Sequence, residues 1–176
     1  MDQSITLVGY GEAGRTFARA AGWQSRAHVF DMQNLDDAFA EDRVCGCSTL
    51  AEALLGSNYA ISVVTADQAL VVAQDVATTI ASGTLFFDMN SVAPDTKRAA
   101  ADAIEAAGGH YIDAAIMSPV DPAGIAVPLL ISGPHCEDGM EALSALGFTN
   151  VRIVGENVGR ASTIKMLRSV MYKGVE

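Results

Sequence analysis

The sequence predicts an α/β protein built on a Rossmann fold, a doubly wound and mostly parallel sheet. Short apolar runs that are typical of strands alternate along the whole chain with segments of helical periodicity. The apolar run at 59–64 shows no alternation with polar residues, as expected for a strand buried on both faces of a parallel sheet. A glycine-rich turn joins the first predicted strand to the first predicted helix. Together these features favour the Rossmann arrangement.

The expected elements follow one another in a regular order. A strand at 5–8 leads through the glycine turn into a helix at 12–23, in which Ala13, Phe17 and Ala20 share one face. Further strands are expected near residues 27–30, 44–45, 59–64, 85–87, 111–114, 127–131 and 151–154. Further helices are expected near residues 33–42, 48–52, 66–80, 94–107 and 136–145 and from 158 onward. The last strands can run antiparallel at one edge of the sheet.

Composition argues against several classes of protein. The 176 residues have a formal net charge of −10 and no basic cluster before the C-terminal segment, so no nucleic-acid partner is expected. No apolar stretch reaches the roughly 20 residues of a membrane span. The first residues lack the basic segment of a signal peptide, so a cytoplasmic location is expected. Cys45 and Cys47 form an isolated pair and Cys136 stands alone, which favours reduced thiols and no metal site.

The segment Gly9-Tyr10-Gly11-Glu12-Ala13-Gly14 matches the glycine pattern of dinucleotide-binding turns. It follows a predicted strand and opens a predicted helix, which is the context that this pattern requires. Gly9 would allow a tight turn, Gly11 would let the backbone approach a pyrophosphate, and Gly14 would let the helix pack on the strand. The N–H groups at the start of the helix would then face the anion. An ordinary glycine turn is the alternative interpretation.

Asp31 ends the second predicted strand and indicates which dinucleotide binds. A carboxylate at this position accepts hydrogen bonds from the ribose hydroxyls and repels a 2′-phosphate. Residues 32–34 are Met, Gln and Asn, so no arginine is available to hold such a phosphate. NAD is therefore the expected cofactor and NADP is disfavoured. A strand-end or helix-capping role is the alternative for Asp31.

Two short segments follow the carboxyl ends of later predicted strands. Val64 and Thr65 come after the third long strand, and Asn90 and Ser91 come after the next one. In open α/β sheets these positions form the crevice in which ligands bind. We therefore expect all four residues to line the nicotinamide end of the cofactor site, with simple turn formation as the alternative.

Three later segments carry a resemblance to a known family. They are Asp88-Met89-Asn90-Ser91 followed by Pro94, the stretch Tyr111-Ile112-Asp113-Ala114-Ala115-Ile116-Met117-Ser118-Pro119-Val120, and residues 155–165. With the glycine turn, they make nearly the whole chain resemble the NAD-binding domain of the β-hydroxyacid dehydrogenases. This family contains 3-hydroxyisobutyrate, tartronate semialdehyde and 6-phosphogluconate dehydrogenases. The Lys-Met-Leu-Arg-Ser and Tyr-Lys-Gly pattern near the end is closer to a phosphogluconate-dehydrogenase-like branch.

The resemblance implies an NAD-dependent oxidoreductase of the β-hydroxyacid type. Such an enzyme transfers hydride between NAD and a small hydroxy acid or the matching carbonyl compound. Lys165 matches the lysine that serves as the family's catalytic acid/base. A lysine desolvated in a closed cleft can have a lowered pKa and can then exchange a proton with a substrate oxygen. A surface lysine on an amphipathic helix is the alternative.

The residues that the resemblance assigns to substrate binding depart from the family pattern. Ser169 lies one helical turn after Lys165, where the family usually has an asparagine. Met117 falls on the serine of the family's carboxylate-binding loop, while Ser118 and Pro119 fall on its glycines. Pro119 removes one N–H donor, and Ser118 is the candidate to replace the serine. The substrate class therefore stays open.

The resemblance also implies a domain organisation. Residues 1–155 would form the NAD-binding Rossmann domain, and residues 156–176 would begin an interdomain helix leading to a C-terminal helical domain that is absent. The chain alone would then be incomplete for catalysis. A homodimer is expected, through that domain or through the apolar stripe of Ile164, Leu167 and Met171. The alternatives are a dinucleotide-binding module without turnover and an imine reductase, which shares the architecture but usually lacks the lysine.

Overall fold

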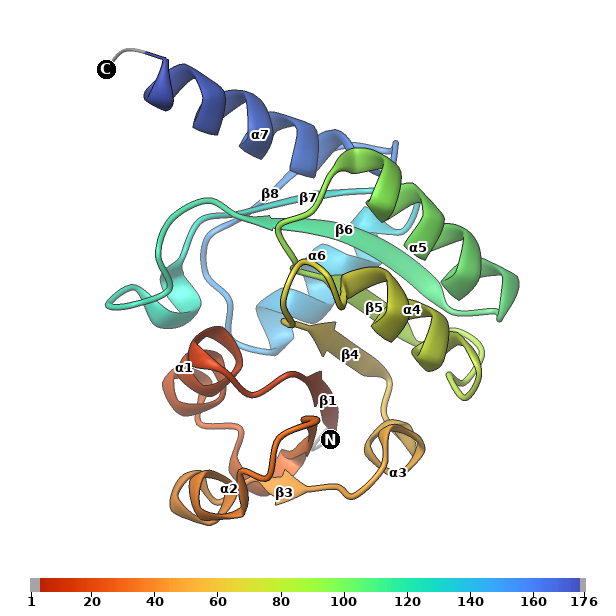
Figure 1. The fold of residues 1–176 in the computed structure, drawn as a ribbon, viewed down its shortest axis with the longest axis vertical. Helices are drawn as coiled ribbons and strands as arrows, with labels where there is room; N and C mark the ends of the chain where they lie inside the picture. The colour runs from red at the N-terminus through yellow and green to blue at the C-terminus, as the bar shows by residue number, and fades with distance from the viewer. Residues whose placement is uncertain (1–3, 175–176) are drawn as a thin grey trace.

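The protein is built around an eight-stranded sheet with the strand order β3-β2-β1-β4-β5-β6-β7-β8 (Figure 1). The computed structural model describes residues 4–174. The strands are β1 (Ile5–Val8), β2 (Ala27–Phe30), β3 (Cys45–Gly46), β4 (Tyr59–Ser62), β5 (Leu85–Asp88), β6 (His110–Ile116), β7 (Leu129–Ser132) and β8 (Val151–Gly155). Strands β1 to β6 are mutually parallel, β7 is antiparallel to β6, and β8 is parallel to β7. The predicted Rossmann fold is confirmed, including the reversal at one edge.

The helices cover both faces of this sheet. They are α1 (Glu12–Ala21), α2 (Asp36–Asp42), α3 (Leu50–Leu54), α4 (Ala69–Ala77), α5 (Pro94–Ala106), α6 (Cys136–Ala145) and α7 (Arg160–Lys173), with short 3-10 turns at Gln24–Arg26 and Gly124–Ala126. One core contains Phe17 of α1 and Phe87 of β5, together with residues of α2 and α6. The other core contains Phe86 and Ile104, together with residues of α3 and α4. Consecutive residues of β5 thus enter opposite cores, as a strand buried on both faces requires.

The first helix is shorter than its periodicity predicts. Helix α1 ends at Ala21 because Gly22 adopts a left-handed conformation, with φ 63°, and its N–H bonds back to the last turn. Ala20, which we expected on the buried face, is exposed, whereas Ala18 is buried. The predicted strand at 44–45 lies one residue later, at Cys45–Gly46.

The single tryptophan joins the N-terminal and C-terminal parts of the molecule. Trp23 is 1% exposed, and its indole N–H donates a hydrogen bond of 2.8 Å to the carbonyl of Leu146. The ring of Phe148 lies 6.2 Å from that of Trp23 and 5.1 Å from that of Phe17. The end of α1 is therefore packed against the segment that follows α6.

Several other predictions concern the described part of the chain. Between residues 4 and 174, no helix has the length and apolar character needed to cross a membrane. The same residues contain no group of three or more His, Cys, Asp and Glu side chains placed to hold a metal ion. Cys45, Cys47 and Cys136 are free thiols, of which only Cys136 is buried.

Candidate functional site: a dinucleotide pocket and a lysine pocket

The turn between β1 and α1 depends on its glycines in two different ways. Gly9 has φ 96°, and a Cβ on it would overlap the carbonyl oxygen of Val63. A Cβ on Gly14 would overlap the carbonyl oxygen of Gly9, so close packing within the protein requires both glycines. A Cβ on Gly11 would meet no protein atom within 4 Å. Gly11 thus leaves its backbone open toward the adjoining pocket, which fits the approach of a pyrophosphate.

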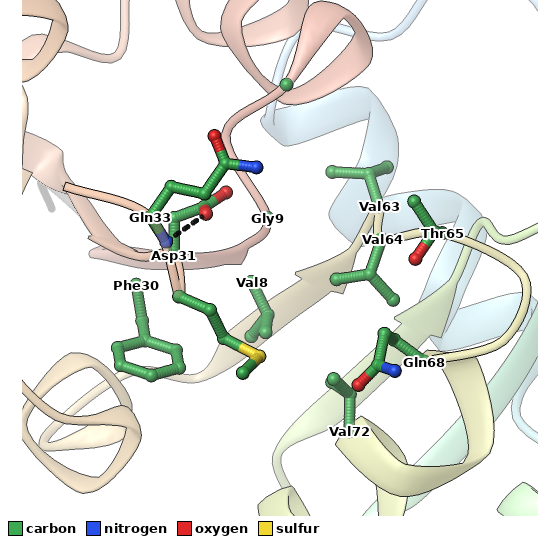
Figure 2. Close-up of a pocket in the computed structure, with 12 residues that line it drawn as sticks. Val8, Gly9, Phe30, Asp31, Gln33, Val63, Val64, Thr65, Gln68 and Val72 are labelled. Atoms are coloured by element: carbon green, nitrogen blue, oxygen red, sulfur yellow. Dashed lines mark hydrogen bonds between the residues drawn. The ribbon is translucent and has the colours of Figure 1, made fainter. Parts of the chain in front are cut away.

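A pocket of about 370 Å³ lies beside this turn, at the carboxyl ends of β1, β2 and β4. In Figure 2, Asp31 and Gln33 lie on one side of the pocket, and Val63, Val64 and Thr65 lie on the other. The pocket is lined by Val8, Gly9, Gly11, Phe30, Asp31, Met32, Gln33, Val63, Val64, Thr65, Gln68 and Val72.

A role of all four strand-end residues at the nicotinamide end of the cofactor site remains a prediction, but Val64 and Thr65 lie apart from the other two. They line the same pocket as Asp31, whereas Asn90 and Ser91 line a different one. The reason is the strand order, in which β4 lies directly beside β1 while β5 is one strand farther away. Residues that follow β4 therefore face the glycine turn, and residues that follow β5 do not.

The carboxylate of Asp31 is fixed by the backbone on both sides. Its Oδ2 accepts a 2.7 Å hydrogen bond from the N–H of Tyr10. Its Oδ1 accepts one of 2.8 Å from the N–H of Gln33 (Figure 2). Each carboxylate oxygen can accept a further hydrogen bond. Asp31 can therefore hold the glycine turn in place and still accept hydrogen bonds from a ribose.

The other residues of the turn contribute mainly through their backbone. The hydroxyl of Tyr10 donates to Asp42 at 2.9 Å, and its ring packs edge-on against Phe39 of α2. Burial, followed by the hydrogen bond to Asp42, raises the pKa of Tyr10 well above its ordinary value. Glu12 is exposed and Ala13 is half-buried at the start of α1. The Tyr10 side chain thus anchors α2, while its main-chain N–H bonds to Asp31.

Both arginines of α1 are paired with carboxylates of α2. Arg15 lies 2.7 Å from Asp42 and 2.6 Å from Glu41, and Arg19 lies 2.6 Å and 3.0 Å from the same two residues. Burial alone would raise the pKa of Asp42, but the hydrogen bonds from the two arginines lower it. Both guanidinium groups are therefore paired with carboxylates. Residues 32–34, after β2, contain no arginine.

A second pocket, of about 270 Å³, lies farther along the sheet, past the end of β5. It brings together four of the residues predicted from sequence: Asn90, Ser91, Lys165 and Ser169. The full lining consists of Asn90, Ser91, Val92, Ala93, Ala115, Ser162, Lys165, Met166 and Ser169. The first pocket and this one are linked by Asn90, whose Oδ1 accepts a 2.7 Å hydrogen bond from the N–H of Val64.

Lys165 projects from α7 into this second pocket. Its Nζ donates a 2.5 Å hydrogen bond to the hydroxyl of Ser91. Partial burial lowers the pKa of Lys165, and the positive charge of Lys97 lowers it further. A lysine with a lowered pKa is better able to take up and release a proton near neutral pH.

The structure does not bring Met117 and Ser118 into the lining of this pocket. The carbonyl of Met117 accepts a 3.1 Å hydrogen bond from Arg168 of α7. The hydroxyl of Ser118 donates to the carbonyl of Pro119 at 3.4 Å. Both residues are half-buried in the segment after β6. Their role in substrate binding remains a prediction.

A buried ionic network that was not predicted from the sequence lies next to the second pocket. The ammonium of Lys97, 0% exposed, donates to the carbonyl of Asp88 at 2.6 Å and to its Oδ1 at 3.1 Å. It also lies 3.3 Å from Oδ1 of Asp113. The hydroxyl of Tyr111 donates to Oδ2 of Asp88 at 2.7 Å. The available signal was helical spacing, because Lys97 lies on the same face of α5 as the buried Ile104.

Comparisons with known proteins agree with this architecture. A family model described as the NAD binding domain of 6-phosphogluconate dehydrogenase matches residues 4–137. No curated protein sequence matches the chain. Among solved structures, a conserved hypothetical protein from Sinorhizobium meliloti 1021 is 34% identical with a TM-score of 0.90, over 99% of this chain and 61% of its own.

Two structures of lower identity share the fold. The 3-hydroxyisobutyrate dehydrogenase of Mycobacterium tuberculosis, solved with L-serine, has a TM-score of 0.84 at 18% identity, over 98% of this chain and 60% of its own. An imine reductase from Pseudomonas sp. has a TM-score of 0.80 at 22% identity, over 98% of this chain and 62% of its own. The chain thus spans about three fifths of the length of the solved structures described here.

The family match covers the parts of the molecule that form the pocket lined by Asp31. Residues 4–137 include β1 and the glycine turn, Asp31 at the end of β2, and the segment after β4. They also include Asn90 and Ser91, which follow β5. The predicted cofactor, NAD, and the predicted family of NAD-binding domains are confirmed. The chain belongs to the family of NAD-binding domains represented by that of 6-phosphogluconate dehydrogenase.

Proposed function

We propose that the protein acts in an NAD-dependent oxidoreductase that transfers hydride between NAD and a small hydroxy acid or the matching carbonyl compound. The observation that carries this proposal is the position of Lys165. Its ammonium lies 2.5 Å from the hydroxyl of Ser91, in a pocket that Asn90 connects to the dinucleotide pocket. Bound NAD supplies the hydride acceptor or donor for the reaction.

In this proposal Lys165 moves the proton that accompanies hydride transfer. It accepts the proton of the substrate hydroxyl during oxidation and returns it to the carbonyl oxygen during reduction. The hydroxyl of Ser91 holds the ammonium in place. Of the described residues that line this pocket, none is a carboxylate, so the local charge suits an anionic substrate. Ser169, on the same face of α7, is a candidate hydrogen-bond partner for that substrate.

The domain organisation inferred from the sequence belongs to the same proposal. Residues 1–155 form the NAD-binding domain, and α7 is the start of the interdomain helix. Three large apolar side chains of α7 support this assignment, because Leu167, Met171 and Tyr172 are 59%, 71% and 69% exposed. Such a surface favours association with further protein, and a homodimer is the form we expect.

The central test is Lys165→Ala in the complete product of the reading frame that encodes this chain. With small hydroxy acids as substrates, NADH formation should fall by about 10²- to 10⁴-fold, because the proton acceptor is lost. The affinity for NADH, measured by calorimetry, should stay within about threefold of the original, since Lys165 does not line the pocket with Asp31. Lys173→Ala on the same helix is the control and should preserve turnover.

Other outcomes would favour the alternatives. Unchanged turnover in Lys165→Ala would remove this lysine from the mechanism. NADH binding with no oxidation of any hydroxy acid would favour a dinucleotide-binding module. Reduction of cyclic imines that survives Lys165→Ala would favour an imine reductase.

A further inference from the structure

The helix that carries Lys165 is held on the sheet mainly through its first turn. Among the described residues of α7, only Ala161 and Ser162 are buried. From Met166 to the end of the helix, the side chains are exposed. The position of Lys165, one turn after Ser162, therefore depends on how that first turn is anchored.

The first turn of α7 is anchored by side chains from two strands. Oδ2 of Asp113, on β6, accepts hydrogen bonds from the N–H groups of Gly159 and Ser162 at 3.0 and 3.1 Å. The hydroxyl of Ser132, on β7, accepts one from the N–H of Ala161 at 2.9 Å and donates to the same Oδ2 at 3.0 Å. The carboxylate of Asp113, which belongs to a strand and not to the helix, thus caps the N-terminus of α7. The helix dipole favours a negative charge at this end.

A buried lysine connects this cap to the opposite wall of the pocket. Lys97 lies 3.3 Å from Oδ1 of Asp113, and it donates to the carbonyl and to Oδ1 of Asp88 at 2.6 and 3.1 Å. The same Oδ1 of Asp88 accepts hydrogen bonds of 3.0 and 2.8 Å from the backbone and side-chain N–H groups of Asn90. Asn90 precedes Ser91, the partner of Lys165. The network of Asp88, Lys97 and Asp113 therefore supports both sides of the contact between Lys165 and Ser91.

We propose that Asp113 is a positioning residue that sets where the ammonium of Lys165 lies relative to Ser91. Lys97 supports it through the 3.3 Å contact with Oδ1 of Asp113 and by joining that carboxylate to Asp88, at the strand end that leads to Ser91. The proposal rests on the proposed function, because that function gives the position of Lys165 its importance. Its test, however, needs neither a substrate nor turnover.

The experiment uses the small number of amines in the chain. The lysines of the 176-residue chain are Lys97, which is buried, Lys165, and Lys173 near the end of α7. Reductive methylation with ¹³C-formaldehyde labels the accessible amines, and NMR then follows the titration of each dimethylamino group. Lys173 serves as the internal reference for an exposed lysine on the same helix. In the unaltered protein, the Lys165 signal should titrate at lower pH than the Lys173 signal.

Asp113→Asn separates a positioning role from a simple charge effect. Loss of a nearby negative charge alone would lower the pKa of Lys165 further, because it removes an attraction for the ammonium. Loss of the anchor would instead release α7 into water and raise the pKa of Lys165 toward that of Lys173. We expect the rise. A pKa of Lys165 that stays the same or falls would overturn the proposal.

Two further variants test whether a general loss of structure could cause the shift in the Lys165 titration. Ser132→Ala removes the hydrogen bond from the N–H of Ala161 and the one to Oδ2 of Asp113 without changing any charge. It should move the Lys165 titration in the same direction as Asp113→Asn but by less. Thr49→Ala removes the hydrogen bond that caps α3, which packs beside other strands, and it should leave the Lys165 titration unchanged. A shift in Thr49→Ala as large as in Ser132→Ala would show that any destabilisation moves Lys165.

Hydrogen exchange gives an independent readout of the anchor. In Ser132→Ala and Asp113→Asn, amides of α7 should exchange about tenfold faster or more, whereas those of α6 should not, because a lost helix cap weakens the helix locally. Equal exchange in α7 would contradict the proposal. If these shifts occur but Lys165→Ala retains full turnover, the proposed function fails and the positioning of α7 stands.

Discussion

At the scale of single residues, Asp31 joins the glycine turn to the end of the neighbouring strand. Its two carboxylate oxygens accept hydrogen bonds from the N–H groups of Tyr10 and Gln33. Each oxygen can accept a further hydrogen bond from a ribose hydroxyl. Asp31→Ala should therefore weaken NADH binding by about tenfold or more, since hydrogen bonds to a charged group are each worth about 1.5–3 kcal/mol. NADPH binding should change less, because the repulsion of its 2′-phosphate is removed at the same time. Calorimetric titration with both cofactors measures the change in preference.

The matched control for Asp31 is its exposed neighbour. Met32 is 83% exposed and lines the same pocket, so Met32→Ala removes contact area without removing charge. It should leave the ratio of NADH to NADPH affinity unaltered. An unaltered ratio in Asp31→Ala as well would show that the carboxylate does not select the cofactor.

At the scale of elements, the turn between β1 and α1 contains glycines that serve different purposes. Gly14→Ala places a Cβ against the backbone of Gly9 and should lower the free energy of unfolding by about 1–3 kcal/mol. Gly11→Ala places its Cβ in open space and should change stability by about 0.5 kcal/mol or less. Gly11→Ala should nevertheless weaken NADH binding, because the Cβ occupies the approach to the backbone. Urea denaturation and calorimetry together separate the two effects.

The two glycine variants act as controls for each other. A Gly11→Ala protein that is as stable as the original but binds NADH poorly would support the assignment of the turn to the pyrophosphate. Equal NADH affinity in the original and in Gly11→Ala would assign the turn to packing alone.

The order of the elements could be read from the sequence, because each strand and helix has its own local periodicity. The glycine turn and Asp31 were predictable for the same reason, since each lies next to an element boundary. The location of Val64 and Thr65 was not, because it depends on which strands are neighbours in the sheet. The burial of Lys97 was not predicted because lysines are usually exposed. Here two carboxylates, Asp88 and Asp113, allow its burial.

At the scale of the whole molecule, buried acidic groups should make the protein sensitive to alkali. Burial, with a smaller contribution from Asp113, raises the pKa of Cys136 from 9.0 to about 12. Burial and then Asp88 raise the pKa of Tyr111 well above its ordinary value. The unfolded chain loses these protons at lower pH than the folded chain, so the free energy of unfolding falls as the pH rises above the unfolded pKa of each group. The lowered pKa of Lys165 acts in the opposite direction, but the pKa of Tyr10, like those of Cys136 and Tyr111, is raised.

Urea denaturation at about pH 8 and about pH 10 measures this loss. Cys136→Ala should reduce the difference between the two free energies of unfolding, because the variant lacks the thiol that must stay protonated in the fold. Cys45→Ala removes an exposed thiol and should leave the difference as it is. Identical pH dependence in the original and in Cys136→Ala would mean that this thiol does not control the alkaline loss.

The contact between Trp23 and the segment after α6 has a practical consequence. The single indole is buried against Leu146 and Phe148. Its fluorescence emission therefore reports whether the end of α1 stays packed against the segment after α6. Loosening of the C-terminal strands would expose the ring to water and shift its emission to longer wavelengths, even with β1 and α1 intact. The fluorescence of Trp23, near the beginning of the chain, thus reports local unfolding of the C-terminal part of the fold.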